Sequence, residues 1–283
     1  MKENFIKLLT KDKAVRIFLV DVSRILERSH LEEMKTDFAK HLYTNLFINC
    51  CLLLGFLTED DQRINVNIRF RPEECTAFCD LNGRGHINCT FSSSLAAFDG
   101  DFKDLVGEGA SLSISRGSWM GGMFTGTVEL KSASIDSAFS YFYSKSEQTE
   151  TIFQTWIHPG IARGCLVQPL PFCHNDRLKD VMNQINHVEQ EMISTKWSEV
   201  PQQLFPFATV VEKDWVLSEC DCFKEMFMGI LMSIETEELK KSIEMGKHEE
   251  LECGVCGRKY IFGTSDLEMI VRMKQSGQGG SVS

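Results

Sequence analysis

The sequence predicts an α+β protein made of an N-terminal α/β core domain with a largely antiparallel sheet, a helical linker and a small C-terminal domain. Three observations carry this prediction: a run of alternating apolar and polar segments, an apolar helical stripe that follows a proline-containing turn, and two close pairs of cysteines near the C-terminus. The predicted parts are a core domain at 1–175, a linker at 176–219, a cysteine domain at 220–274 and a disordered tail at 275–283.

The core domain is predicted to begin with a buried strand at residues 15–20, which are almost wholly apolar. Residues 31–57 then place apolar side chains at three- and four-residue spacing, which predicts one long helix. Alternating or apolar short runs bounded by turn residues predict strands at 64–70, 76–81, 85–91, 111–115 and 124–130. The domain ends in a predicted short helix and two further strands, at 138–147, 151–156 and 161–167.

Two short segments of this domain predict a hairpin turn and a buried helix. Asn82-Gly83 stands between two apolar runs and therefore predicts a tight hairpin. Residues 46–57 form the most apolar stretch, but a membrane span needs about 20 such residues, so we expect a buried helix there.

The linker follows the turn Pro169-Leu170-Pro171. A helix is predicted over 176–195, with its apolar stripe formed by Leu178, Val181, Met182, Ile185, Val188 and Met192. Such a stripe most often packs on the protein's own core. The opposite face is polar, and the segment is acidic overall.

The C-terminal domain is predicted to surround its cysteines with short helices and a strand. Helical patterns cover 223–234 and 236–245, the second ending at Gly246, and a strand covers 258–262. Ser265-Asp266-Leu267-Glu268 has the spacing of a capping box, which predicts that a final helix opens at Ser265.

Composition limits the possible functions. The chain has 43% apolar residues, enough for a packed core, and a formal net charge of −10, which disfavours binding to nucleic acid or anionic lipid. The first residues, Met1 to Asn4, show no secretory segment. Eleven cysteines in a chain without an export signal indicate a reducing compartment. We therefore expect a cytoplasmic protein whose thiols bind metal or do redox chemistry.

The cysteine pairs are Cys220-Asp221-Cys222 and Cys253-Gly254-Val255-Cys256, with residues 223–252 between them. This arrangement predicts a structural zinc site, since zinc takes four sulfur ligands in a tetrahedron. A thioredoxin-like redox motif at Cys253 and Cys256 is an alternative, but it needs a βαβ setting that the sequence does not show. Four unrelated thiols are the third interpretation, which the close pairing in both places disfavours.

A zinc site here would control the folding of the domain. A segment of this size has little core of its own, and structural zinc contributes about 10–16 kcal/mol to folding in small peptides. Zinc-bound thiolates are also the form that oxidants attack, and the close pairs could bond locally once the metal is lost. The site could therefore act as a sensor whose oxidation unfolds the domain and exposes the linker's apolar stripe.

At these residues the chain resembles the 33 kDa chaperonin family, the redox-regulated holdase chaperones of bacteria (the heat-shock protein 33 family). The cysteine spacing and the following Lys259-Tyr260-Ile261-Phe262 resemble that family's zinc domain. Phe124-Thr125-Gly126-Thr127-Val128 resembles its FTGQV-type strand, and residues 140–148 (SYFYSKSEQ) resemble its segment ending in Ser-Glu-Gln. Weaker similarity covers most of residues 5–274.

The resemblance implies a core domain, a metastable linker and a zinc-binding redox switch. It implies one zinc held by Cys220, Cys222, Cys253 and Cys256 in the reduced form, and disulfides Cys220–Cys222 and Cys253–Cys256 in the oxidised form. Zinc release and linker unfolding would then give an ATP-independent holdase that binds unfolding client proteins under oxidative stress and dimerises when activated. No enzymatic activity, nucleic acid or membrane is expected.

The chain also departs from the family. Arg69-Phe70-Arg71-Pro72 replaces its glycine-rich turn, and seven further cysteines are present: Cys50, Cys51, Cys75, Cys79, Cys89, Cys165 and Cys173. Cys75, Cys79 and Cys89 could form a second metal or disulfide site, although buried thiols acting as small apolar side chains are the more usual case.

Two rival functions stay open. A nucleic-acid-binding zinc ribbon predicts a basic stripe, whereas residues 220–283 contain more acidic than basic side chains. A thiol–disulfide oxidoreductase predicts an exposed cysteine of low pKa and no closed four-cysteine site.

Overall fold

The computed structural model describes residues 3–118, 122–220, 222–253 and 258–277, and it separates into two compact units. Unit 1 comprises residues 1–219 and unit 2 comprises residues 220–283. Each unit has an apolar core of its own.

Unit 1 contains two five-stranded antiparallel sheets. The first, sheet A, has the strand order β10-β1-β2-β9-β8. Its strands, in chain order, are β1 (Phe5–Thr10), β2 (Val15–Asp21), β8 (Ile152–His158), β9 (Ile161–Pro169) and β10 (Ala208–Asp214). The predictions for β2, β8 and β9 are confirmed. Neither β1 nor β10 was expected from the sequence, and they pair with each other from Phe5↔Asp214 to Thr10↔Ala208.

The second sheet, sheet B, has the order β5-β4-β3-β6-β7. Its strands are β3 (Gln62–Arg69), β4 (Thr76–Asn82), β5 (Ile87–Phe91), β6 (Ser111–Ser118) and β7 (Gly122–Glu129). All five strands were predicted. In β3, β4, β5 and β6 one side is buried, so the alternation of apolar and polar residues is clear in the sequence.

The hairpin between β4 and β5 is present, but its turn is longer than a two-residue Asn-Gly turn. The Asn82 Oδ1 atom accepts hydrogen bonds from the N–H groups of Arg84 (3.0 Å) and His86 (3.1 Å). The left-handed conformation falls on Gly85, with φ of 78°. A Cβ atom at Gly85 would lie 2.2 Å from the carbonyl oxygen of Trp215, so this glycine also permits a close approach of the two backbone segments.

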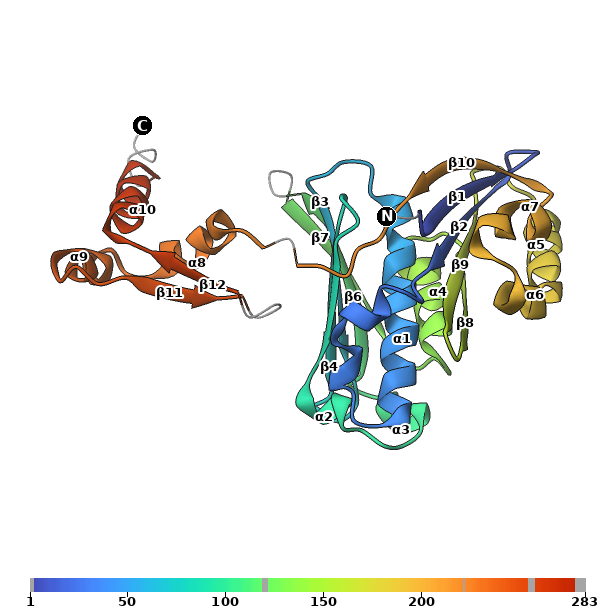
Figure 1. Cartoon of the computed structure of the whole chain (residues 1–283), viewed down its shortest axis with the longest axis horizontal. Coiled ribbons are helices and arrows are strands. Elements are labelled where there is room, and N and C mark those ends of the chain that lie inside the picture. Colours follow the sequence, from blue (N-terminus) through green and yellow to red (C-terminus); the bar gives the residue numbers. More distant parts are fainter. Residues whose placement is uncertain (1–2, 119–121, 221, 254–257, 278–283) are drawn as a thin grey trace. The chain divides into compact units, whose positions relative to one another are not determined.

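Helix α1 (Asp37–Leu52) lies between the two sheets and packs on β2, β8 and β9 of sheet A and on β4 and β5 of sheet B (Figure 1). Eleven of its residues are buried, so both of its faces contribute to the core. The predicted helix at 31–57 is too long. The Thr36 side chain caps the N-terminus by accepting from Ala39 N, and short 3-10 turns stand on either side: η2 (His30–Glu33) and η3 (Leu53–Phe56).

Helix α4 (Ile135–Ser146) packs on β7, β8 and α1 and confirms the predicted short helix. Smaller elements complete this part of unit 1: η1 (Leu26–Arg28), α2 (Ser93–Ala96) and α3 (Phe102–Leu105).

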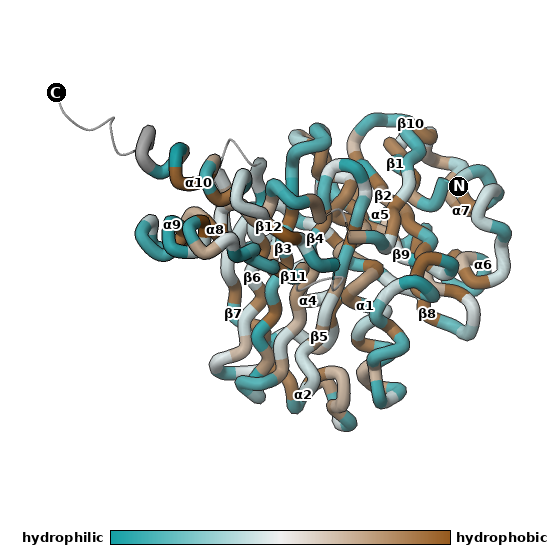
Figure 2. The backbone as a smooth tube through the Cα atoms, turned by 60° about the vertical axis from the view of Figure 1, so that its left-hand side comes forward, coloured by the Kyte–Doolittle hydropathy of each residue, from teal (hydrophilic) through white to brown (hydrophobic). Residues whose placement is uncertain are grey.

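Residues 176–219, predicted as a linker, form further elements of unit 1. The predicted helix at 176–195 is divided at Val188 into two helices, and the segment ends in β10. Its helical elements are α5 (Asn175–His187), α6 (Glu189–Ser194), η4 (Trp197–Glu199) and α7 (Val200–Leu204). Figure 2 shows hydrophobic residues along β1, β2 and β9, the strands on which these helices pack.

Unit 2 is a small arrangement of helices around one two-stranded sheet. Its elements are η5 (Lys224–Phe227), α8 (Met228–Ser233), α9 (Thr236–Glu244), β11 (Glu249–Glu252), β12 (Lys259–Phe262) and α10 (Thr264–Gly277). Strand β11 was not predicted. Helix α10 opens at Thr264, before the expected Ser265, and the Asp266 carboxylate accepts from the Gly263 N–H at 2.9 Å. Figure 2 shows α9 as mainly hydrophilic.

No helix among the described residues combines the length and apolar character that crossing a membrane requires. This agrees with the expectation that residues 46–57 are buried: α1 ends at Leu52, and η3 continues the buried segment.

Cys79 and Cys89 form a disulfide in sheet B. The sequence favoured buried free thiols at these positions, and that expectation is wrong for this pair. The pairing of β4 with β5 places Cys79 directly opposite Cys89, which brings the two sulfurs together. Cys75 does not take part and is buried.

Candidate metal centre

The hairpin β11–β12 positions Cys253 in unit 2. Strand register pairs Glu252 with Lys259, and the next residue, Cys253, donates its N–H to Arg258 O at 2.8 Å. The cysteine is thereby fixed at the end of the hairpin where the chain turns. Cys256, the fourth predicted ligand, lies outside the described residues.

Cys220 and Cys222 come from the first residues of unit 2 and lie beside Cys253. The three Sγ atoms are all within 4.8 Å of one another, and the Sγ atoms of Cys220 and Cys253 are 3.7 Å apart. Four sulfurs around zinc, each about 2.3 Å from the metal, lie about 3.8 Å from one another. The sulfur positions therefore fit one edge of such a tetrahedron, and the cluster could hold a metal ion.

Tyr260 and Arg258 fix the backbone and the sulfur of Cys222. The Tyr260 hydroxyl donates to Cys222 O at 2.6 Å and lies 3.1 Å from Cys222 Sγ, and Arg258 Nη1 donates to Cys222 O at 3.4 Å. Burial, together with the hydrogen bond to Cys222, raises the pKa of Tyr260, so its hydroxyl remains a donor. Donors of this kind orient metal ligands and stabilise their charge.

The cluster is shielded from solvent although unit 2 is small. Cys222 and Cys253 are 7% and 6% exposed, and Cys220 is partly buried. The rings of Phe227 and Tyr260, the residue whose hydroxyl contacts Cys222, lie 4.9 Å apart. A closed environment of thiols without a wide opening is typical of a structural metal site.

An ion pair connects the start of unit 2 to its last helix. Lys224 Nζ lies 2.7 Å from Asp266 Oδ2, and the same carboxylate caps α10 through Gly263 N. The hydrogen bond from Lys224 is the main reason that the pKa of Asp266 is below its ordinary value. This contact holds the segment that follows Cys222 against the helix that follows β12.

Comparison with known proteins identifies the family. The model of the Hsp33 protein family matches residues 3–263. The chain belongs to the Hsp33 family. The resemblance stated from the cysteine spacing and the Ser-Glu-Gln segment is thereby confirmed.

Curated members of the Hsp33 family match over nearly their whole length. A protein of Lactobacillus delbrueckii subsp. bulgaricus named 33 kDa chaperonin is 25% identical, with 97% of this chain and 99% of that protein covered. The 33 kDa chaperonin of Lactiplantibacillus plantarum is 28% identical, with 96% and 98% covered. The crystal structure of the 33 kDa chaperonin from Thermotoga maritima has a TM-score of 0.69 at 18% identity, covering 97% of this chain and 100% of that one. The α+β fold is therefore that of Hsp33.

The two segments that resembled the Hsp33 core lie against each other in unit 1. Gly126 of β7 faces the C-terminal part of α4, where an added Cβ would be 2.2 Å from Ser146 Oγ and 2.9 Å from Phe142 Cζ. A pocket of about 400 Å³ is lined by these three residues together with neighbours that include Ile114 and Phe124. The small residue in the Phe-Thr-Gly segment is thus required for close packing of strand on helix.

The predicted apolar stripe of the linker covers sheet A. Leu178, Val181, Ile185 and Met192 are buried. They pack against apolar side chains of the sheet, among them Ile6, Leu8, Val15, Ile17, Leu19, Trp156 and Val167. Release of residues 176–219 would expose both surfaces.

Tyr260, Arg258 and Arg163 are functional candidates that sequence reasoning missed. Arg163 is 4% exposed and donates to Asp21 Oδ2 at 2.8 Å, and to the carbonyl oxygens of Met192 and Thr195 at 2.6 and 2.8 Å. It thereby ties the end of α6 to sheet A. Each of these contacts joins residues distant in sequence, so no local pattern signals it.

Proposed function

We propose that this chain is a redox-regulated, ATP-independent holdase chaperone whose reduced, inactive form holds one zinc ion. Cys220, Cys222, Cys253 and Cys256 are the proposed ligands. Zinc would supply a tetrahedral centre that keeps the four thiolates together and stabilises unit 2. The observation that carries the proposal is the convergence of Cys220, Cys222 and Cys253 in a unit with a very small core.

The core of unit 2 explains why its folding would depend on the metal centre. Only a few of its described side chains are buried and apolar: Leu231, Leu239, Phe262, Leu267, Ile270 and Val271. A core of this size does not offset the conformational entropy of the chain that it orders. Bonds from the four cysteines to zinc would supply the folding free energy that the small core lacks.

The activating step is oxidation of the neighbouring cysteines. In each pair, two thiolates lose two electrons to form one S–S bond, and one hydrogen peroxide takes up these electrons and two protons from solvent to give two molecules of water. The proposed pairs are Cys220–Cys222 and Cys253–Cys256. Each disulfide removes two ligands from the centre, so that unit 2 loses its main source of stability.

Client binding follows from the surface under residues 176–219. This segment immediately precedes Cys220, and its apolar stripe and the face of sheet A beneath it are buried in the folded state. We propose that unfolding of unit 2 spreads into this segment and uncovers both surfaces. Contiguous apolar surface of this kind binds the apolar surface of unfolding proteins and favours self-association, which supports a homodimer in the activated state. Thiols that must stay reduced at rest support a cytoplasmic location.

The proposal is tested by following zinc and chaperone activity in one sample. Reduced protein is treated with hydrogen peroxide under mild heat, zinc release is read with a metal-sensitive dye, and suppression of aggregation of an unfolding test protein is measured in parallel. We expect about one zinc per chain to be released together with the gain in suppression.

Two variants make the test specific. Cys256→Ser should lower the zinc content and give suppression without oxidant, whereas Cys173→Ser, which changes a thiol of unit 1 outside both cysteine clusters, should behave as the unchanged protein. If zinc is retained through oxidation, or is released with no gain in aggregation suppression, the metal only stabilises unit 2 and the proposed chaperone switch is excluded.

A further inference from the structure

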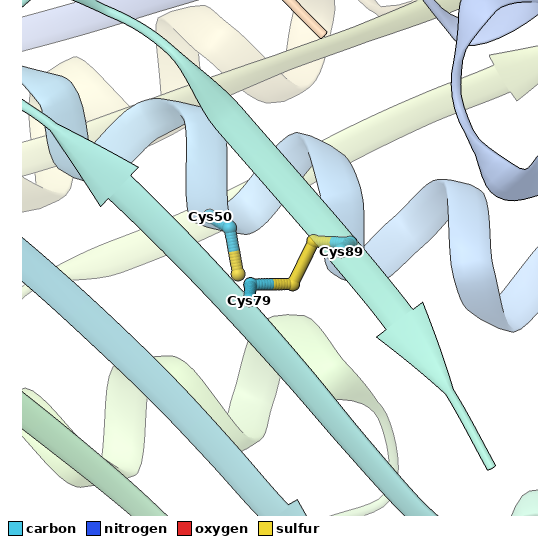
Figure 3. A group of neighbouring side chains, drawn as sticks. All are labelled: Cys50, Cys79 and Cys89. Carbon is cyan, nitrogen blue, oxygen red and sulfur yellow. A yellow bond between two sulfur atoms is a disulfide. The ribbon is translucent and has the colours of Figure 1, made fainter. Parts of the chain in front are cut away.

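A second cluster of three sulfurs lies in the core of unit 1. Cys50 comes from α1, Cys79 from β4 and Cys89 from β5, and their Sγ atoms are all within 4.8 Å of one another. Figure 3 shows Cys79 joined to Cys89 across the two strands, with the Cys50 side chain pointing toward this pair. Each of the three residues is 1% exposed.

The local structure explains why two of these sulfurs are bonded. Cys79 and Cys89 are directly opposite each other in the antiparallel ladder, with their Cα atoms 4.1 Å apart. Both side chains point to the side of the sheet that α1 covers, where the surrounding core is apolar. A disulfide is neutral and therefore suits this environment, whereas a site of three thiolates would place several negative charges in it.

We propose that Cys79 and Cys89 form a second redox pair, chemically separate from the metal centre, whose disulfide fastens the β4–β5 hairpin of unit 1. In the forming step, one thiol is oxidised by hydrogen peroxide to a sulfenic acid with release of water. The second thiol then displaces the hydroxyl group, so that the S–S bond forms and a second water leaves. Two electrons pass from the pair to the peroxide.

The position of β5 gives a peroxide access to the pair. Strand β5 has five residues and lies at the edge of sheet B, so its local opening leaves the other strands of the sheet paired. Residues 85–87 also bond to Leu217: Ile87 N donates to Leu217 O at 2.8 Å and Leu217 N donates to Gly85 O at 2.8 Å. Release of the segment that ends at residue 219 therefore removes a contact that holds β5 closed.

Cys50 acts as a packing partner and does not displace the bonded pair. Exchange requires a thiolate, and complete burial raises the pKa of the Cys50 thiol well above its ordinary value, so it stays protonated in the closed sheet. The Cys79–Cys89 bond therefore persists once it has formed.

The consequence is opposite behaviour of the two units under oxidant. The disulfide closes the loop of residues 80–88, which limits the unfolded conformations of the hairpin and so stabilises it. Oxidation then strengthens sheet B in unit 1, and this holds whether or not the cysteines of unit 2 act as proposed.

Peptide mapping of the full chain tests the pair directly. Arg84 lies between the two cysteines, so trypsin leaves Cys79 and Cys89 on separate peptides that stay joined only by a disulfide. Reduced protein is treated with hydrogen peroxide under mild heat, its remaining thiols are alkylated, and the digest is examined by mass spectrometry with and without reductant. We expect the joined peptides in the oxidised sample and their loss on reduction.

Matched cysteine variants assign the bond. Because Cys75 shares a tryptic peptide with Cys79, the joined peptides should persist in Cys75→Ala and in Cys51→Ala, a buried neighbour outside the cluster. They should be absent in Cys89→Ala. Alkylation of both Cys79 and Cys89 in oxidised, unchanged protein would overturn the proposal.

Hydrogen exchange on the unchanged protein tests the stabilisation without relying on any variant to fold. Amides of β4 and β5 should exchange about tenfold more slowly, or slower still, in the oxidised than in the reduced protein. Strand β6 of sheet B, which pairs with β3 and β7, serves as the internal reference. Equal exchange of β4 and β5 in the two states would exclude a fastening role.

Discussion

The Tyr260 hydroxyl contacts a sulfur of the candidate metal centre. It lies 3.1 Å from Cys222 Sγ and 2.6 Å from Cys222 O. A donor to a ligand sulfur reduces the charge that the metal must balance and keeps the ligand oriented, so its removal weakens metal binding without removing a ligand.

Tyr260→Phe should therefore weaken zinc binding by about tenfold, with little change in packing because the ring that contacts Phe227 is retained. The measurement is competition for zinc with a chromophoric chelator on reduced protein. Tyr141→Phe, at an exposed residue of unit 1, is the control. Equal zinc affinity of Tyr260→Phe and the unchanged protein would show that this hydroxyl has no part in metal binding.

Gly126 limits the distance between β7 and α4. Gly126→Ala would bring a methyl group 2.2 Å from Ser146 Oγ and 2.9 Å from Phe142 Cζ, so we expect destabilisation of unit 1 by about 1–3 kcal/mol. Denaturant unfolding measures it. Adding Ser146→Ala should restore part of the loss because the nearest contact is removed. If the double variant is no more stable than Gly126→Ala alone, the clash with Ser146 is not the cause.

Some of these residue-scale features could be predicted and others could not. The pairing of Cys220 and Cys222 with Cys253 was visible as spacing, since the chemistry of a metal site requires particular residue types close together. The contacts of Tyr260 with Cys222, and the bond of Cys79 with Cys89, depend on strand register. The sequence showed the strands of the second pair, but their register became known only from the structure.

Two arginines help to hold the helices of residues 176–219 to sheet A. Arg163, deep in the unit, reaches Asp21 and the carbonyl groups that end α6, while Arg177 of α5 reaches Asp12 in the β1–β2 turn at 2.5 Å. The first pair is buried and the second is at the surface, with side-chain exposures of 5% and 14% against 27% and 45%. The buried Arg–Asp pair should therefore matter more for the stability of the unit than the exposed one.

Arg163→Met should release α6 in the reduced protein. Breaking a buried pair by removal of one partner costs about 3–5 kcal/mol, whereas an exposed pair contributes about 1 kcal/mol or less, which makes Arg177→Met the matched control. Hydrogen exchange of α6 and aggregation suppression without oxidant are the measurements. We expect faster exchange and partial activity for Arg163→Met alone. Unchanged exchange in α6 would contradict the role given to Arg163.

The Asp12 carboxylate gives the β1–β2 turn, which Arg177 of α5 contacts, a pH dependence. Hydrogen bonds, first from Thr10 and then from Ala14 N and Arg177, lower the pKa of Asp12 from 3.8 to about 2. Because this pKa is lower in the folded state, the stabilisation is present above pH 3.8 and is lost as the pH falls toward 2. The stability difference between the unchanged protein and Asp12→Asn should therefore shrink over this interval, as measured by denaturant midpoints. A difference independent of pH would show that the carboxylate charge is not involved.

At the scale of elements, prediction succeeded where burial is one-sided. Strands β3, β4, β5 and β6 of sheet B alternate in the sequence because one of their faces is buried in the core. Helix α1 was overestimated because the apolar pattern continues into η2 and η3, while its start is set by the Thr36 cap. Strand β10 was missed because most of its side chains are exposed or only partly buried, and it is recognised as a strand only by its pairing with β1.

At the scale of the whole molecule, the two units should respond differently to loss of metal. Chelation of zinc from reduced protein removes the proposed ligand bonds of unit 2, and the unfolding that spreads into residues 176–219 releases β10 but none of the other strand pairings of unit 1. We expect peptides of β11, β12 and α10 to lose hydrogen-exchange protection while β2, β3 and β9 keep theirs, and zinc addition to restore the first group. Protection of unit 2 that persists after complete zinc removal would contradict metal-dependent folding.

The pairing of β1 with β10 also has a consequence for synthesis of the chain. Strand β1 is complete once Thr10 has been made, but its second neighbour in sheet A begins only at Ala208. At about 5–20 residues per second, translation of the intervening residues takes about 10–40 s. During that interval one edge of β1 has no strand to pair with, so a protein of a chaperonin family itself passes through an aggregation-prone stage on the ribosome.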